Sequence, residues 1–348
     1  MIQKIEIDNF RGINKLSLND LSDINIFVGA NNSGKTSILE AIKLMAAPTD
    51  FGQFVSLALQ RAQASGEQKQ NNLVNYVGSL FQTYSDDDGS KSYGVSMYMV
   101  YDEHKYSYDV AGETGIIITT DGSTKDALDI TIATAKDDGK KGYLFKRLIN
   151  GTAGNFTATE DPLFKATYLD SSVKYYSSCV KYLSEIIISQ GKKDILNILK
   201  SFDKHIEDIS IVGNDIYLFN SISGSLPLFS YGQGMQKALL LTSLIAYCKN
   251  GVILIDEIDN AIHISAFKDV FMWFIDACKK NHVQAFVTTH SIEALDAILD
   301  AAHNSNQGNM LRVITLRKSE KTNSTKCKVR TGEQAYNDRE IFRMELRI

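Results

Sequence analysis

The chain has 348 residues, of which 44% are hydrophobic and 22% are charged, as is ordinary for a soluble globular protein. Its formal net charge of −4 at pH 7 argues against a uniformly basic surface of the kind that coats nucleic acid. The opening residues show no basic region followed by an apolar run, and the apolar stretches are short, so we expect neither a signal peptide nor a membrane span. The four cysteines lack metal-type spacing, which favours a reduced, cytoplasmic location.

The N-terminal part predicts strands and a helix around a glycine-rich segment. Residues 2–8 alternate apolar and polar side chains and residues 24–28 read INIFV, which predicts two strands joined by a short turn. Apolar residues recur at helical spacing over 36–46, and Pro48 marks the end of that helix.

The middle of the chain predicts an insertion. Between residues 93 and 150, short alternating runs are separated by Gly and Asp turns, which indicates an antiparallel β-meander. Residues 50–80 have a helical or irregular pattern, and residues 163–206 predict helices. We therefore expect an inserted β-meander and helical lobe at 51–225.

The last third alternates helices with strands. Helices are expected near 234–248, 261–280, 291–302 and 333–344, and strands at 251–255, 283–288, 310–317 and 326–330. Continuous apolar strands indicate a sheet buried on both faces, and their alternation with helices predicts a mostly parallel α/β core. We expect a single domain over 1–348, with its core formed by the parts 1–50 and 226–348.

The glycine-rich segment matches the phosphate-binding pattern G-x-x-x-x-G-K-[S/T] in full. Its glycines let backbone N–H groups turn inward around phosphate oxygens, and the helix N-terminus that follows favours an anion. In this pattern Lys35 reaches the β- and γ-phosphates, and the Thr36 hydroxyl ligates Mg²⁺. A chance glycine turn is the alternative, and the flanking strand and helix argue against it. The predicted nucleotide-binding residues of this segment are Gly29, Ala30, Asn31, Asn32, Ser33, Gly34, Lys35, Thr36 and Ser37.

A second motif, VILIDE at residues 252–257, places two acids at the end of an apolar strand. Asp256 is suited to hold Mg²⁺, and Glu257 is suited to polarise the attacking water as general base. The alternative is that both acids merely cap a following helix, and the phosphate loop upstream argues against this. Because the sequence has no [N/T]-K-x-D guanine-reading motif, we expect the nucleotide to be ATP and not GTP. The cofactors are therefore expected to be ATP and Mg²⁺.

The order of these motifs resembles the ABC ATPase superfamily in its SMC, RecF and OLD-like branch. The opening IEIDNFRGINKLSL and the loop GANNSGKTSILEAI are similar to the corresponding segments of those proteins. FSYGQ resembles the family's signature L-S-G-G-Q: Ser230, Gly232 and Gln233 match, while Phe229 and Tyr231 depart from it.

Two further segments extend the resemblance. DEIDNAIH is similar to the acidic motif and the D-loop after it, with His263 where many members carry Asp. TTHS places His290 where the family carries its switch histidine. The resemblance covers about 1–50 and 210–348, and the middle matches only loosely.

The resemblance implies a phosphate-loop ATPase head with a mostly parallel central sheet, a β-meander subdomain and an inserted helical lobe. It further implies that two copies sandwich two ATP molecules, with the phosphate loop of one copy facing the signature of the other. The signature residues that would contact nucleotide are Ser230, Gly232, Gln233 and Gly234. His290 would sense the γ-phosphate, so the predicted catalytic residues are Lys35, Glu257 and His290.

The most similar subgroup is the stand-alone AAA-family ATPases of bacterial anti-phage defence. OLD-type nucleases carry a Toprim domain after the ATPase, and too few residues follow His290 for one. We therefore expect an ATP-hydrolysing homodimer, or a higher oligomer, that regulates a separate nuclease or toxin without a membrane partner. Two alternatives stay open: a RecF-like DNA-repair ATPase, which the basic segment 311–330 favours, and a non-catalytic nucleotide switch, against which intact Lys35, Asp256 and Glu257 argue.

Some features carry two interpretations. Arg11 either packs near the nucleotide or lies in a solvated turn. Residues 86–88, all Asp, favour a solvated acidic turn over a metal site, because no other ligands accompany them. The segment 311–330 is either a nucleic-acid face or a lysine-protected edge hairpin. Gln53 and Gln82 are the candidates for the family's Q-loop glutamine.

Overall fold

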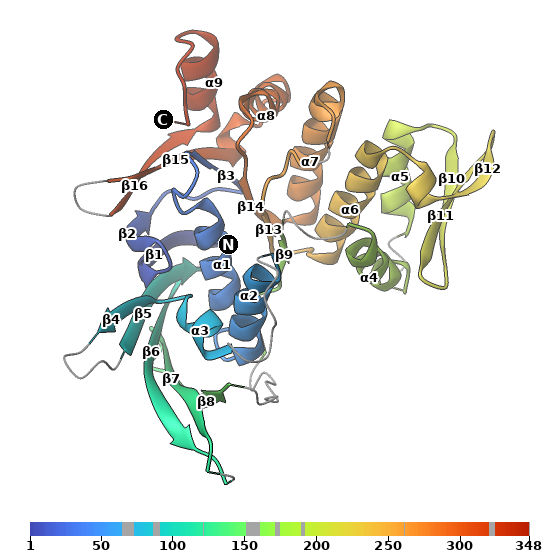
Figure 1. Cartoon of the computed structure of the whole chain (residues 1–348). Helices are drawn as coiled ribbons and strands as arrows, with labels where there is room; N and C mark the ends of the chain where they lie inside the picture. The colour runs from blue at the N-terminus through green and yellow to red at the C-terminus, as the bar shows by residue number, and fades with distance from the viewer. Residues whose placement is uncertain are drawn as a thin grey trace. The chain divides into compact units, whose positions relative to one another are not determined.

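The computed structural model describes residues 1–64, 73–85, 91–120, 122–150, 161–170, 175–188, 192–260, 262–319 and 324–347. The chain, drawn in Figure 1, divides into two compact units that each combine segments distant in the sequence. The first unit comprises Met1–Leu21, Gly29–Phe164 and Leu316–Lys328, and the second comprises Ser22–Val28, Lys165–Thr315 and Val329–Ile348. Among the described residues, no helix is both long and apolar enough to cross a membrane. The division at 1–50, 51–225 and 226–348 stays a prediction.

The first unit is built on an antiparallel sheet. Its strands follow the order β2-β1-β5-β6-β7-β8, and β4 pairs with β5. The strands are β1 (Ile2–Phe10), β2 (Ile13–Leu18), β4 (Gln82–Ser85), β5 (Lys91–Tyr101), β6 (His104–Ile118), β7 (Thr124–Lys136) and β8 (Lys141–Ile149). Each of the hairpins from β5 to β8 is antiparallel, so the meander predicted over 93–150 is confirmed.

The first hairpin differs from the prediction. β1 pairs antiparallel with β2, and the pair ends at Phe10 opposite Ile13. The expected turn between residues 2–8 and 24–28 is therefore wrong. The segment INKLSL alternates as well as the segment before it, and its apolar side chains are buried on the same sheet.

Three helices belong to the first unit: α1 (Lys35–Ala46), α2 (Phe51–Ala64) and α3 (Leu73–Gly78). Phe54 of α2 stacks on Tyr108 of β6, with ring centroids 6.1 Å apart and an angle of 22° between the rings. This buried aromatic pair fastens α2 to the sheet.

An ion pair fastens α1 to the turn between β1 and β2. Arg11 Nε lies 2.7 Å from Glu40 Oε2, and both side chains are buried. Arg11 is therefore a buried residue of the first unit, and its interpretation as a solvated turn residue is wrong.

The second unit is built on a largely parallel sheet in the order β16-β15-β3-β14-β13-β9. The sheet consists of β3 (Ile24–Gly29), β9 (Ala166–Leu169), β13 (Val252–Ile255), β14 (Gln284–Thr288), β15 (Leu311–Lys318) and β16 (Thr325–Thr331). The part Leu316–Lys328 of its last two strands belongs to the first unit. β3, β14, β13 and β9 pair in parallel, and every residue of β13 and β14 is buried. The predicted mostly parallel core with two covered faces is confirmed.

Helices and a small sheet complete the second unit. The helices are α4 (Tyr175–Ile188), α5 (Lys192–Phe202), α6 (Gln233–Tyr247), α7 (Phe267–Asn281), α8 (Ile292–Asn304) and α9 (Gly332–Glu340). The sheet, β10-β11-β12, consists of β10 (Ile206–Val212), β11 (Asp215–Asn220) and β12 (Gly224–Pro227). As Figure 1 shows, α6 packs against α7 and α7 against α8, and these helices carry the functional segments described below.

Two predicted elements of the second unit are wrong in part. The sequence predicts helices over 163–206, yet β9 lies within this stretch. A strand of four residues is too short to show an alternating pattern in the sequence. The helix expected at 261–280 begins at Phe267, because His263 starts a short 3₁₀ turn, η2 (Ile264–Ala266), by accepting a hydrogen bond from Ser265 N at 3.3 Å.

We expect Arg11→Met to lower the free energy of unfolding by about 3 kcal/mol, because it leaves the Glu40 carboxylate buried without its cation. Arg11→Met/Glu40→Met should recover most of this loss, since apolar side chains replace a buried ion pair at little cost. Lys4→Met is the matched control: Lys4 pairs with Glu6 at the surface of the same sheet, and the unfolding midpoint should barely move. Urea unfolding followed by circular dichroism measures all three, and equal midpoints for Arg11→Met and Lys4→Met would contradict the expectation.

Candidate active site

The loop between β3 and α1 has the backbone that close approach of a phosphate requires. Gly29 and Gly34 adopt φ angles of 148° and 100°, and Asn32 adopts 63°. A Cβ on Gly29 would lie 2.5 Å from the carbonyl oxygen of Leu316, so no other residue fits there without displacing the backbone. Residues 30–32 are exposed between the two glycines.

The N-terminus of α1 favours an anion. Its N-cap, Gly34, has no side chain to cap it, and no acidic residue occupies the first turn. Helical bonding begins with Ile38 N, which donates to Gly34 O at 3.0 Å. The first N–H groups of a helix point out of its N-terminal end and carry its positive partial charge.

Lys35 lies along the loop. Its Nζ donates to the carbonyl oxygens of Gly29 at 2.8 Å and Ala30 at 3.0 Å, and the residue is 5% exposed. Thr36 is partly exposed at the next position, while Ser33 and Ser37 are buried. The loop therefore combines a buried ammonium, held against its own carbonyl oxygens, with a partly exposed hydroxyl.

The acidic pair follows β13 in the second unit, where Thr288 at the end of β14 holds it. The Thr288 hydroxyl donates to Asp256 Oδ1 at 2.6 Å and accepts from Glu257 N at 2.8 Å. Thr288 is fully buried and Asp256 is 9% exposed. One hydroxyl thus orients the Asp256 carboxylate and fixes the backbone at Glu257.

Glu257 has a backbone conformation that few side chains adopt. Its φ is 54°, in the left-handed region, which costs a non-glycine residue on the order of 1 kcal/mol. The residue is partly exposed. The strand therefore ends in a strained turn, and such strained positions cluster at functional sites.

The segment after Thr288 is held at each residue. Thr289 donates through Oγ1 to Asp259 Oδ1 at 2.5 Å. The backbone oxygen of His290 accepts from Arg347 Nη1 at 2.9 Å, and the hydroxyl of Ser291 caps α8. The predicted switch histidine therefore lies between two anchored neighbours.

The signature segment forms a 3₁₀ turn, η1 (Leu228–Ser230), and the start of α6. Ser230, Gly232 and Gln233 are exposed. A Cβ added to Gly232 or Gly234 would meet nothing within 4 Å among the described residues. Like α1, α6 begins at a glycine without a side-chain cap and without an acid in its first turn.

α8 and α9 begin differently. The side chains of Ser291 and Thr331 cap them, and Glu293 and Glu333 occupy their first turns. In such a helix, the capping side chain already accepts a hydrogen bond from a free N–H group, and the carboxylate already offsets the positive partial charge of the helix end. The starts of α1 and α6, which the sequence assigns to phosphates, lack both devices.

Lys237 on α6 is a buried cation that the sequence analysis missed. It is 2% exposed, and burial lowers its pKa to about 8, while the carboxylates of Asp259 and Glu257 oppose this shift. At neutral pH the ammonium stays mostly protonated. It supplies the segment after β13 with a positive charge from the helix that follows the signature.

The structure distributes the predicted residues over its units. The loop residues 29–37 belong to the first unit, and the signature, Asp256, Glu257 and His290 belong to the second. Asp256 and His290 follow two neighbouring parallel strands, which brings their segments together at one edge of the sheet. Their roles stay predictions.

Several supporting residues escaped the sequence analysis: Thr288, Thr289, Asp259, Lys237 and Arg347. The spelling TTHS offered a signal for two of them, since hydroxyls at a strand end commonly bond neighbouring loops. Nothing local pointed to Arg347, because its partner His290 is distant in the sequence.

Other candidates are engaged locally or lie outside the description. Gln53 donates to Asp50 at 3.3 Å, and His263 caps η2. Residues 86–88 and the side chain of Gln82 lie outside the described residues.

The residues present fit ATP and Mg²⁺ in their chemistry. Lys35 and the start of α1 suit phosphate oxygens. The hydroxyl of Thr36 and the carboxylate of Asp256 are oxygen donors of the kind that Mg²⁺ prefers.

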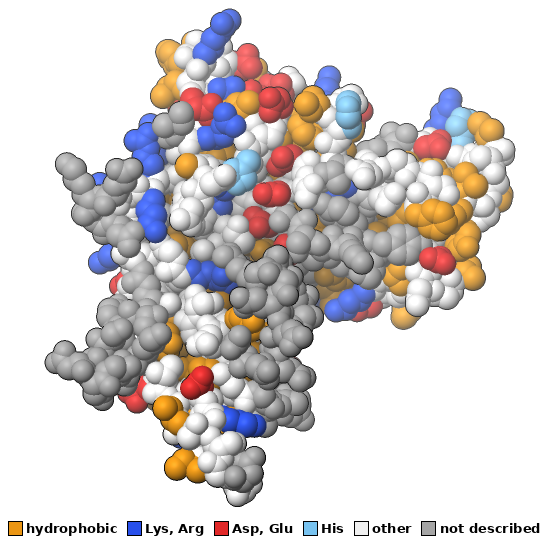
Figure 2. All heavy atoms as spheres, viewed as in Figure 1, with side chains coloured by type: hydrophobic (Ala, Val, Ile, Leu, Met, Phe, Trp, Pro, Cys, Tyr) orange, Lys and Arg blue, Asp and Glu red, His pale blue; other side chains and the backbone are white. Residues whose placement is uncertain are grey.

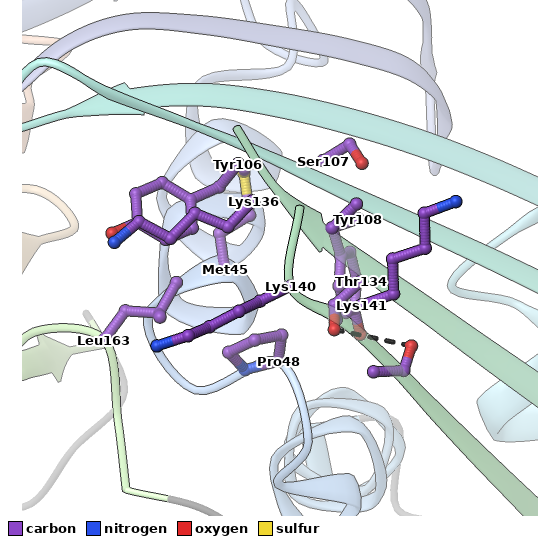
Figure 3. Close-up of a pocket in the computed structure, with 12 residues that line it drawn as sticks. Met45, Pro48, Tyr106, Ser107, Tyr108, Thr134, Lys136, Lys140, Lys141 and Leu163 are labelled. Carbon is purple, nitrogen blue, oxygen red and sulfur yellow. Dashed lines mark hydrogen bonds between the residues drawn. The ribbon is translucent and has the colours of Figure 1, made fainter. Parts of the chain in front are cut away.

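A separate cavity of about 350 Å³ lies in the first unit and is lined by none of the predicted site residues. Figure 3 shows it between Tyr106 and Lys140 on one side and Lys141 on the other. Asp138 lies 3.4 Å from Lys136 Nζ and 4.0 Å from Lys140 Nζ. This carboxylate offsets part of the positive charge that Lys136, Lys140 and Lys141 bring to the rim.

Two family models each match more than half of the chain. One, described as an AAA ATPase domain, matches residues 1–182. The other, described as an AAA domain, putative AbiEii toxin, Type IV TA system, matches residues 113–296.

Individual proteins extend these matches. A Helicobacter pylori protein named ATP/GTP phosphatase is 24% identical over 341 residues, which cover 87% of this chain and 90% of that protein. The DNA replication and repair protein RecF of Acinetobacter baylyi is 46% identical over 50 residues, only 14% of each chain.

Solved structures share the fold. One is an SMC head bound to the C-terminal winged-helix domain of ScpA, with a TM-score of 0.51 and 14% identity over 96% of this chain and 99% of that one. Another is an SMC head with an extended coiled coil bound to the C-terminal domain of ScpA, from Pyrococcus furiosus, with a TM-score of 0.50 and 13% identity over 99% and 100% of the two chains. The predicted fold class is confirmed as that of an SMC-like ATPase head.

We expect Thr288→Val, which removes one hydroxyl at nearly constant volume, to lower kcat for ATP hydrolysis by about 10-fold or more. The change leaves Asp256 and the Glu257 N–H without their shared partner, and loss of precise placement carries such a cost. Thr242→Val is the matched control, because Thr242 is a buried threonine of α6 whose hydroxyl donates to Ala238 O of the same helix. Steady-state phosphate release decides the matter, and equal rates for the two variants would contradict the role of Thr288.

Proposed function

The chain belongs to the family of AAA ATPase domains and hydrolyses ATP, and we propose that it does so as a homodimer that closes around ATP and regulates a separate effector. The observation that carries this proposal is the open start of α6. Ser230 and Gly232 present an exposed helix end without a side-chain cap and without an acid in its first turn. Such an end suits the phosphates of a nucleotide held by another copy of the chain.

The first half of the site is the loop of one copy. Lys35 and the backbone of residues 29–37 bind the β- and γ-phosphates, and the loop glycines allow the backbone to approach them. Thr36 and Asp256 would supply oxygen ligands to Mg²⁺, which would neutralise charge on the phosphates. Lys35 is already positioned along the loop by two carbonyl oxygens, so little of its side-chain entropy is lost on binding.

Glu257 and His290 act on the reacting water and the γ-phosphate. Glu257 accepts a proton from the attacking water, and its backbone has the left-handed conformation described above. His290 contacts the γ-phosphate and, because it directly precedes the cap of α8, links the presence of this phosphate to the position of that helix. Thr288 and Thr289 hold both segments in register.

The second half of the site is the signature of the other copy. The Ser230 hydroxyl and the first N–H groups of α6 donate to the γ-phosphate and complete its shell of donors. Gly232 and Gly234 leave space for this approach. ATP then joins two copies, and hydrolysis releases them.

A separate effector is the natural recipient of this cycle. The fold is that of SMC heads, and the solved heads above carry bound ScpA domains. One matching family is described as an AAA domain, putative AbiEii toxin, Type IV TA system, which supports a toxin as the separate effector. A role in bacterial anti-phage defence is the finer part of this proposal. The genes next to that of this chain are the observation that discriminates this role from others.

We expect Glu257→Gln to lower the hydrolysis rate at least about 100-fold, because the amide keeps the shape of the side chain but cannot accept the proton. ATP should then stay bound and hold two copies together. Mass photometry with Mg²⁺ and ATP should show dimers for Glu257→Gln and monomers for Lys35→Ala.

Glu207→Gln, an exposed glutamate of β10, is the matched control and should behave as the unmodified chain. Unchanged hydrolysis in Glu257→Gln would remove this residue from the role of base. If Glu257→Gln binds ATP and stays monomeric, the proposed dimer around ATP is wrong.

A RecF-like DNA-binding function is the second candidate. Within the segment 311–330, Arg312 and Arg330 are engaged internally, while Lys326 and Lys328 are exposed on the edge strand β16. On the face shown in Figure 2, Lys and Arg side chains lie near β15 and β16 without forming a continuous surface. An edge hairpin protected by lysines accounts for this pattern as well.

We expect Lys326→Glu/Lys328→Glu to weaken any ATP-stimulated DNA binding and to reduce its salt dependence by about two counterions, because each lysine contacts one phosphate. Fluorescence anisotropy over a salt series measures both quantities. An absence of binding to the unmodified chain at low salt contradicts the second candidate.

A further inference from the structure

The segment after α9 ends in an ion pair that reaches the switch histidine. Arg347 binds Glu345 in two places, with Nε 2.8 Å from Oε1 and Nη2 2.9 Å from Oε2. Its remaining nitrogen, Nη1, donates to the backbone oxygen of His290 at 2.9 Å. The hydrogen bonds from Arg347 lower the pKa of Glu345 to about 2, so both groups are charged at neutral pH.

The backbone beside this pair is anchored on the second unit. Leu346 is fully buried, and its oxygen accepts from Thr315 Oγ1 at 2.7 Å. Arg339 of α9 binds Asp296 of α8 with two hydrogen bonds of 2.6 and 2.7 Å. Arg347 is therefore presented to His290 from a fixed backbone and not from a loose end.

The bond to His290 sets the direction of its peptide group. Thr289 before it is tied to Asp259, and Ser291 after it is fixed as the cap of α8. With both neighbours held, this bond fixes the peptide plane that follows His290 and so restricts the backbone from which its side chain departs. A charge-assisted bond to that carbonyl is strong enough to select one orientation.

We infer that Arg347 is a positioning residue for ATP hydrolysis, which holds the imidazole of His290 in its working direction through the backbone carbonyl. This inference rests on the proposed role of His290 at the γ-phosphate. The segment 345–347 thereby takes part in the ATPase reaction, although it carries no recognisable motif and lies far from the motifs in the sequence.

The test is a double-variant cycle in ATP hydrolysis. We expect Arg347→Ala and His290→Ala each to lower kcat by about 10-fold or more, with KM changed less than about 3-fold, since the contact acts on geometry and not on ground-state binding. The double variant Arg347→Ala/His290→Ala should be no slower than His290→Ala alone, because the arginine acts only through the histidine.

Arg347→Lys should be intermediate, since an ammonium cannot hold Glu345 in two places and also reach the carbonyl. Arg312→Ala is the matched control, because Arg312 also donates to main-chain oxygens of the second unit, at Asn309 and Leu311, and should leave kcat unchanged.

A second readout needs no nucleotide. With histidines labelled at Cε1, the His290 resonance is assigned by its loss in His290→Ala, and Arg347→Ala should shift it while Arg312→Ala does not. If the His290 resonance does not shift in Arg347→Ala, the inference is wrong. It is also wrong if adding Arg347→Ala to His290→Ala lowers kcat by the same factor as Arg347→Ala lowers it alone. A normal rate in His290→Ala overturns the proposed role of His290 instead, so the two failures are distinguishable.

Discussion

The hydroxyl of Thr288 is the contact on which the arrangement of acids depends. β13 and β14 are parallel neighbours, with Ile255 opposite Val287, so the next residues of both strands emerge at the same edge. A carboxylate as buried as that of Asp256 needs a donor, and the Thr288 hydroxyl supplies it from the adjacent strand. The same oxygen accepts the N–H of Glu257, so one atom fixes the direction of one acid and the backbone of the other.

A second constraint concerns helix ends. An N-terminus that is to receive a phosphate has to forgo the cap and the acid that would otherwise stabilise it. The starts of α1 and α6, at Gly34 and Gly232, lack both, which is what the proposed phosphate contacts require, while Ser291 and Thr331 cap α8 and α9 in the usual way. Sites of this kind thus cost stability at the helix and gain affinity for an anion.

Sequence reasoning located what local signals encode. The meander, the parallel core and the helix after Gly34 follow from periodicity within a few residues. β9 escaped because its four residues gain their strand character only from pairing with β13, which is distant in the chain. The site shows the same division: His290 lies in a recognisable spelling, whereas Arg347 and Lys237 matter through contacts that only the folded chain creates.

The left-handed backbone of Glu257 has a consequence for how such a chain evolves. Its φ of 54° is the conformation that glycine and asparagine accept most easily. A change of Glu257 to glycine or asparagine would therefore relieve this backbone cost while it removes the acid. A lineage released from selection for turnover should lose Glu257 early, whereas the phosphate loop, where Gly29 and Gly34 already satisfy their backbone, has no such incentive to change.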